Sequence, residues 1–225
     1  MVQSVEELGM VLKQAFYIAR SGRPGPVVID IPKDMFGKIC DFTMPQTEED
    51  LYLKGYQVKT VGEESAIDAV VEALQKAKKP VLFMGGGVIS ANAGAAMLAL
   101  AQKTGIPVVT SLMGISALPT DLPYYLGMVG MHGTYAANMA VTECDMLIGF
   151  GVRFDDRVTS VLSEFVPHGK IAHFDVDPAE FEKNVPVEWK VQGDLAWSLP
   201  LLAQKAVAGE ISDWQQQIAL WQQEH

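Results

Sequence analysis

Short apolar runs alternate with amphipathic stretches over most of this chain. Buried strands are predicted where the run is continuous and bounded by turn residues, at 80–84 (PVLFM), 106–110 (IPVVT), 145–150 (DMLIGF), 170–176 (KIAHFDV) and 188–192. Helical spacing of apolar residues predicts helices at 64–77, 91–104, 134–143, 178–184 and 195–207. Residues 111–133 show no clear period. Strands that alternate with helices predict an α/β fold, an open and mostly parallel sheet with helices on both faces.

The amino-terminal stretch has a different pattern. Residues 4–21 have helical periodicity, and VVIDI at 27–31 predicts a short buried strand. A lone strand has nothing to pair with, so we expect residues 1–40 to be the end of a domain whose other elements lie outside this chain. Residues 41–62 are mixed in character and predict a linker.

The last stretch, 211–225, carries a narrow apolar stripe. Trp214, Ile218 and Trp221 recur at helical spacing, which predicts one helix with a single apolar face. We expect that face to pack on a partner surface, supplied by a further domain outside the chain.

Composition and charge narrow the class of partner. The chain has 225 residues, a net charge of −10 and a pI of about 4.8, which disfavours nucleic acid and anionic membranes as partners. No apolar run approaches the roughly 18 residues of a membrane span. The start of the chain lacks the pattern of a secretory signal, and Cys40 and Cys144 match no metal or redox spacing. These features predict a cytoplasmic protein with two reduced thiols.

Candidate chemistry gathers where the predicted strands end, because ligands of such sheets bind beyond the carboxyl ends of the strands. The residues that follow the strands are Gly85, Gly86 and Gly87; Thr110, Leu112 and Met113; the segment 151–157 (GVRFDDR); Asp175 to Asp177; and Gly193 with Asp194. Glycines, a hydroxyl, two arginines and acids suit a nucleotide that has phosphates and a ribose.

The glycine run does not match the usual dinucleotide fingerprint. In GGGVIS the third glycine is replaced by Ser90, and no acid occurs between Ala73 and Thr120, although lysines do. The acid-free stretch favours an anionic ligand, and Asp175 is the candidate for a ribose contact. A plain strand-to-helix turn explains the glycines equally well.

Other polar residues have structural interpretations beside the functional ones. Asp177 and Asp194 are placed to cap helices, and His132 is a lone histidine in a glycine-rich loop. The sequence contains no pattern of a Ser-His-Asp set, a metal cluster or a carboxylate pair. We therefore predict no catalytic residue and no metal ligand in this chain.

Four motifs in order resemble one family. GRPGPVVIDIPKD, GMVGMHGTYAAN, GVRFDDRVTS and DVDPAE with the later VQGD are similar to the acetohydroxyacid synthases (acetolactate synthases), which depend on thiamine diphosphate. The resemblance spans essentially the whole chain. Pyruvate oxidase and glyoxylate carboligase share the architecture and a flavin but match these motifs less well. Catabolic acetolactate synthases, which work without flavin, lack a stretch like RFDDR.

The resemblance implies a domain plan. Residues 1–40 would end the pyrimidine-binding domain, 41–62 would be a linker, 63–207 would form the six-stranded central FAD-binding domain, and 208–225 a linker helix towards the diphosphate-binding domain. The implied enzyme condenses two pyruvates, or pyruvate and 2-oxobutyrate, with loss of CO2, in branched-chain amino acid biosynthesis. FAD has a largely structural role in this transferase.

The resemblance also implies which parts lie elsewhere. The family's catalytic glutamate and its thiamine diphosphate and Mg²⁺ motif match nothing in this chain, so the fragment is expected to be inactive alone. A homodimer or homotetramer with a small regulatory subunit is implied for the whole enzyme. A redox relative such as pyruvate oxidase and a non-catalytic nucleotide-binding module remain the alternatives.

The family's FAD contacts carry over onto matching positions. Arg23 of GRPGP matches an arginine that reaches the flavin nucleotide from the first domain. The other matching positions are Gly85, Gly86, Gly87, Thr110, Leu112, Met113, Met131, His132, Gly133, Gly151, Arg153, Asp155, Arg157, Val158, Asp175, Val176, Gly193 and Asp194.

Overall fold

The structure, a computed structural model, describes residues 1–224. The chain divides into two compact units, Met1–Lys59 (unit 1) and Thr60–His225 (unit 2). No helix of the described chain is both long and apolar enough to span a lipid bilayer.

Unit 1 contains little regular structure. Helix α1 spans Leu8–Arg20 and a 3-10 turn, η1, spans Lys33–Gly37. The buried strand predicted at 27–31 is wrong, because this segment forms no strand and Val28 is 91% exposed. The amide of Val2 donates to the Asp30 carbonyl at 2.8 Å, but no strand of unit 1 pairs with the segment. An unpaired segment cannot form a ladder, whatever its propensity.

Unit 2 is built on one sheet of six parallel strands in the order β3-β2-β1-β4-β5-β6. The strands are β1 Pro80–Met84, β2 Val108–Thr110, β3 Tyr125–Met128, β4 Met146–Phe150, β5 Lys170–Asp175 and β6 Trp189–Gln192. The predicted α/β class with an open parallel sheet is confirmed. Only β3 was not predicted: it is short, and Gly127 within it has a φ of +90°.

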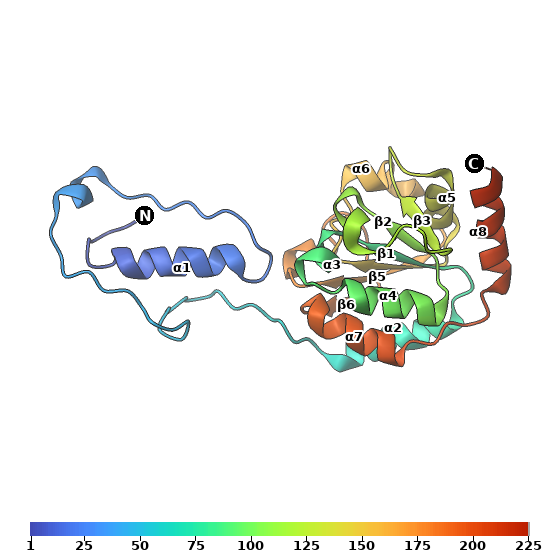
Figure 1. Cartoon of the computed structure of the whole chain (residues 1–225), viewed down its shortest axis with the longest axis horizontal. Coiled ribbons are helices and arrows are strands. Elements are labelled where there is room, and N and C mark those ends of the chain that lie inside the picture. The colour runs from blue at the N-terminus through green and yellow to red at the C-terminus, as the bar shows by residue number, and fades with distance from the viewer. Residues whose placement is uncertain (225) are drawn as a thin grey trace. The chain divides into compact units, whose positions relative to one another are not determined.

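Helices cover the sheet on both faces. Figure 1 shows α2 (Glu64–Lys76), α4 (Gly94–Thr104) and α7 (Leu195–Lys205) on one side and α5 (Tyr135–Glu143) on the other. The apolar face of α2 buries Ile67, Val70 and Leu74 as its spacing predicts.

Two helix predictions need correction. The helix expected at 91–104 begins at Gly94, because Asn92 has a φ of +51° and separates α4 from a short helix, α3 (Gly86–Ser90). The helix expected at 178–184 is wrong: only a 3-10 turn, η4 (Pro178–Glu180), forms there. Glu182 has a φ of +57°, which no right-handed helix accepts.

Two α-helices of the described chain remain. The one-turn helix α6 (Asp156–Thr159) follows β4 and contains Arg157. Helix α8 (Ser212–Glu224) lies along the amino-terminal ends of β1, β2 and β3. Its stripe of Trp214, Ile218 and Trp221 is buried within unit 2. The Trp214 indole donates to the Pro80 carbonyl at 3.1 Å, at the start of β1. The expectation that a domain outside the chain must cover this stripe is therefore wrong.

Candidate functional site

The strand order reverses between β1 and β4. From β1 the chain crosses over to β2 on one side, while β4 leads on to β5 on the other. Ligands of open α/β sheets bind at such a switch point, outside the carboxyl ends of the strands. This carboxyl edge of unit 2 is the candidate dinucleotide site.

Glycines of two loops interlock at this point. The Gly85 amide donates to the Phe150 carbonyl at 2.9 Å, and the Gly87 amide donates to the Gly151 carbonyl at 3.2 Å. A Cβ on Gly85 would lie 2.2 Å from the Gly151 oxygen, and one on Gly87 would lie 2.6 Å from the Gly151 Cα. The glycines are therefore required by backbone packing, and they fix where the 151–157 turn begins.

Phe154 shapes the 151–157 turn. Its backbone is left-handed, with a φ of +48°, and its ring is buried. The ring makes edge contacts with Phe83 and Phe165, with centroids 5.9 and 6.0 Å away. Because the Phe154 ring is buried, the side chains of its charged neighbours, Arg153 and Asp155, lie at the protein surface at the carboxyl edge of the sheet.

The two arginines of the turn are exposed. Arg153 Nη2 lies 3.0 Å from Asp155 Oδ2, and Arg157 Nε lies 3.9 Å from Asp156 Oδ2. Side chains that are 60% and 74% exposed gain little from such pairs, because solvent screens them. Both guanidinium groups could therefore exchange these weak ion pairs for contacts with an anionic ligand at little cost in free energy.

The other carboxylate oxygen of Asp155 is an unused acceptor. Oδ1 is buried and accepts no hydrogen bond from residues 1–224. Buried polar atoms in folded proteins nearly always have a partner. A hydroxyl group of a bound ligand would supply the missing donor.

The loop after β3 is tied to the same turn. The Met131 amide donates to the Arg157 carbonyl at 3.1 Å. Asn138 of α5 accepts from the Gly130 amide at 2.8 Å and donates to its carbonyl at 3.1 Å. Asn138 was not predicted as a site residue; the available signal was an amide side chain inside a helix of small apolar residues.

Large apolar side chains are exposed on these loops. Leu112 and Met113 follow β2, in η2 (Leu112–Ala117), and Met131 follows β3; all three are more than half exposed. Exposed apolar surface beside arginines is a combination that suits a flat aromatic ligand with a charged tail.

The ends of β5 and β6 lie side by side. Asp175 is buried, its Oδ1 accepts from the Asp177 amide at 2.9 Å, and the Gly193 amide donates to its carbonyl at 3.0 Å. Asp177 Oδ1 accepts from the Ala179 amide and Asp194 Oδ1 from the Ala196 amide. The capping interpretation of these two acids is confirmed.

Apart from Arg23, every position with a predicted FAD contact lies at the carboxyl edge of unit 2, on a strand end, a loop or one of the short helices α3, η2 and α6 that follow the strands. Arg23 belongs to unit 1. Thr110 is fully buried and its hydroxyl donates to the Ser111 carbonyl, so this side chain serves the loop itself. His132 is exposed. The ligand contacts of all these residues stay predictions.

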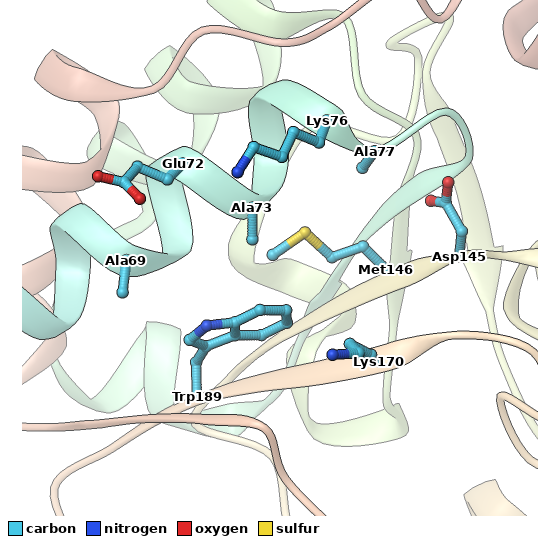
Figure 2. A pocket seen from close by; sticks show the side chains of 9 residues that line it. All are labelled: Ala69, Glu72, Ala73, Lys76, Ala77, Asp145, Met146, Lys170 and Trp189. Atoms are coloured by element: carbon cyan, nitrogen blue, oxygen red, sulfur yellow. The ribbon is translucent and has the colours of Figure 1, made fainter.

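Two hollows of unit 2 lie at the opposite, amino-terminal edge. The larger, of about 440 Å³, lies between α2 and the starts of β4, β5 and β6. Figure 2 shows the Met146 side chain between Ala73 of α2 and the ring of Trp189. Its rim mixes Glu72 and Asp145 with Lys76 and Lys170, so it favours no one sign of ligand. We place the dinucleotide site at the carboxyl edge, where the glycine turns and arginines are.

Within the described chain, no three His, Cys, Asp or Glu side chains are grouped so that they could hold a metal ion.

Comparison with known proteins gives one family match. Residues 67–202 match the model of the thiamine pyrophosphate enzyme central domain. The chain is 41% identical to the acetolactate synthase large subunit of Haemophilus influenzae over 98% of its length and 39% of that relative. It is 42% identical to the acetolactate synthase isozyme 2 large subunit of Escherichia coli, over 100% of this chain and 39% of that relative. The probable acetolactate synthase large subunit of Methanocaldococcus jannaschii is 45% identical to the chain, over 94% of this chain and 36% of that relative. The chain thus spans less than two fifths of the length of these relatives.

Proposed function

The chain belongs to the thiamine pyrophosphate enzyme family, and from that premise we propose that it supplies the FAD-binding central domain of an acetolactate synthase large subunit. The proposed enzyme condenses two pyruvates, or pyruvate with 2-oxobutyrate, and releases CO2. Relatives at about 40% identity that carry this name support the assignment.

One observation carries the FAD part of the proposal, namely the turn at 151–157. Exposed Arg153 and Arg157 stand beside Asp155, whose buried Oδ1 has no donor in the described chain. Cations beside an unused acceptor fit a diphosphate that is followed by a chain of hydroxyl groups. The exposed Met113 and Met131 would face a flat ring.

We assign roles to the chain's own residues accordingly. Arg153 and Arg157 would neutralise phosphate oxygens, Asp155 would accept from a hydroxyl of the ligand, and Asp175 would hold the ribose. Gly85, Gly87 and Gly151 let the two loops approach each other and so set the place of the arginines. FAD, when bound, would act chiefly as a structural part, because the condensation needs no net oxidation or reduction.

The proposal extends to the whole enzyme. Thiamine diphosphate and Mg²⁺ would be bound by other parts of the enzyme, since the motif that the resemblance implies for them matches nothing in this chain. We propose a cytoplasmic oligomer of large subunits with a small regulatory subunit, as the word "large subunit" in the names of the relatives suggests.

Titration of this chain with FAD tests the proposal. We expect quenching of the flavin fluorescence and a higher melting temperature in the wild-type chain. Arg153→Ala should weaken binding by about tenfold or more, because a charge-assisted hydrogen bond to phosphate is lost.

The matched control is Lys170→Ala at the amino-terminal edge. Lys170 forms an ion pair of the same length, 3.0 Å, with Glu188, and is as exposed as Arg153. Equal weakening by both variants, or no FAD binding by the wild-type chain at high concentration, would count against the site. If the complete enzyme consumed oxygen with pyruvate and made no acetolactate, the synthase assignment would fail in favour of a redox relative.

A further inference from the structure

We propose that His173 is a positioning residue of the dinucleotide edge, which holds the Val152 carbonyl and so fixes the start of the arginine turn. This role rests on the proposed FAD site and adds a residue that makes none of its predicted contacts.

His173 lies on β5 and is completely buried. Its Nε2 is 2.9 Å from the Val152 carbonyl oxygen and 3.6 Å from Asp175 Oδ2. Val152 directly precedes Arg153, and Asp175 is on the same face of β5 as His173, since side chains two apart in a strand point the same way. One ring nitrogen thus lies beside both halves of the candidate site.

The geometry fixes the proton on Nε2. A carbonyl oxygen only accepts, so the close contact to Val152 requires Nε2–H as the donor. Nδ1 has no hydrogen-bond partner in the described chain, so it offers a proton no acceptor. Nε2 therefore carries a proton, and the ring directs this N–H towards the turn.

Aromatic contacts hold the ring in this orientation. His173 meets Phe154 edge-on at a centroid distance of 4.9 Å and Phe181 at 5.1 Å. Phe154 is the same buried ring that shapes the arginine turn. His173 therefore supports the 151–157 turn in two ways: its N–H contacts the Val152 backbone, and its ring packs against Phe154.

A core histidine that only packs would behave differently from a positioning residue. His173→Phe keeps the ring and its edge contacts but removes the donor, which leaves the Val152 carbonyl unsatisfied. His173→Gln keeps an N–H donor close to the place of Nε2. A packing role predicts that Phe is the better replacement, whereas a positioning role predicts that Gln is.

The first measurement is FAD affinity in this chain by fluorescence titration. We expect His173→Phe to raise the dissociation constant about fivefold or more, and His173→Gln to stay within about twofold of wild type. Leu100→Ala is the control, because Leu100 is also completely buried but lies on α4 and is no predicted site residue. It should lower the melting temperature and leave FAD affinity unchanged.

The second measurement needs no ligand. The ¹⁵N shifts of the imidazole should place the proton on Nε2, and His173→Phe should move the amide signals of Arg153 and Asp155 more than His173→Gln does. Equal FAD affinity in both variants, or an Nε2 that carries no proton, would overturn the role of His173. Absence of FAD binding in the wild-type chain would overturn the proposed function instead, and the amide signals would still decide the role of His173.

Discussion

Gly151 and Phe154 lie three positions apart, and both have left-handed backbones for different reasons. Gly151 has no room for a side chain, because the Gly87 backbone occupies that space. Phe154 has a side chain that fills a hydrophobic site, and its packing offsets the backbone strain of about 1 kcal/mol or more. Both residues serve to place Arg153 at the edge.

Gly151→Ala should destabilise unit 2 by about 2–4 kcal/mol, because the new Cβ would lie 2.5 Å from the Gly87 Cα at a φ of +57°. Denaturant unfolding of the wild type and the variant gives this difference in the free energy of unfolding, provided that the slope with denaturant concentration is the same for both. Gly37→Ala is the control, since no atom lies within 4 Å of its Cβ position, and it should change stability by less than about 0.5 kcal/mol. A Gly151→Ala protein as stable as the control would contradict the interlock.

Residue-level prediction from sequence succeeded where a signal was local. The glycines at 85–87 and the arginines at 153 and 157 stand directly after apolar runs, so their place at the edge could be predicted. The role of His173 could not be predicted, because its contacts with Val152 and Phe154 cross between neighbouring strands. Asp177 and Asp194 could be assigned as caps because the backbone amides that donate to their carboxylates lie only two residues further along the chain.

At the scale of elements, α2 and α7 are joined at their ends by one cation. Lys205, the last residue of α7, lies 2.5 Å from Glu64 Oε1 and 2.6 Å from Asp68 Oδ1 of α2. Hydrogen bonds to Asp68 and then to Glu64 raise the pKa of the Lys205 ammonium group above its usual value. The interaction joins helices that are far apart in sequence and packed side by side.

Lys205→Met should lower the melting temperature slightly at neutral pH. Because the pKa is raised in the folded state, the stabilisation is complete below the unfolded pKa of about 10.4 and is lost as the pH rises through the folded value. The melting temperatures of the wild type and the variant should therefore converge as the pH rises through the raised folded pKa.

The control for this effect is Lys76→Met, because Lys76 is an exposed lysine at the end of α2. It should shift the melting temperature little at any pH. If the difference in melting temperature between Lys205→Met and the wild type stayed constant with pH, the aliphatic part of the lysine side chain, and not its charge, would stabilise the helix pair.

Element predictions failed where the backbone departed from the pattern. Residues 178–184 have helical spacing, but Glu182 takes a left-handed conformation. The segment 27–31 has the composition of a strand, yet a strand needs a neighbour and unit 1 offers none. β3 is too short and too interrupted by Gly127 for a periodicity signal.

For the whole molecule, the two units carry one thiol each. Cys40 in unit 1 is half-buried, whereas Cys144 in unit 2 is completely buried, and burial raises the pKa of its thiol well above the usual range. The thiolate is the reactive form, so Cys144 should be inert while unit 2 is folded.

Residues 60–225 produced alone should therefore fold and protect Cys144. We expect the labelling rate of Cys144 by a thiol reagent to equal that in the complete 225-residue chain at each denaturant concentration. The Cys40→Ser variant of the 225-residue chain leaves Cys144 as the one thiol, so it shows which part of the labelling belongs to Cys144. Rapid labelling of Cys144 in the shorter chain would show that unit 2 needs residues 1–59 in order to fold.

The interlock of Gly85, Gly87 and Gly151 has an evolutionary consequence. When two side chains collide, a smaller residue at the partner position can usually restore the fit. Here both partners are already glycines, so no second substitution can make room for a first. Homologues should therefore change at this junction only by rebuilding both loops together, and mutational searches for altered cofactor preference will find their accessible routes at Leu112, Met113 and Met131.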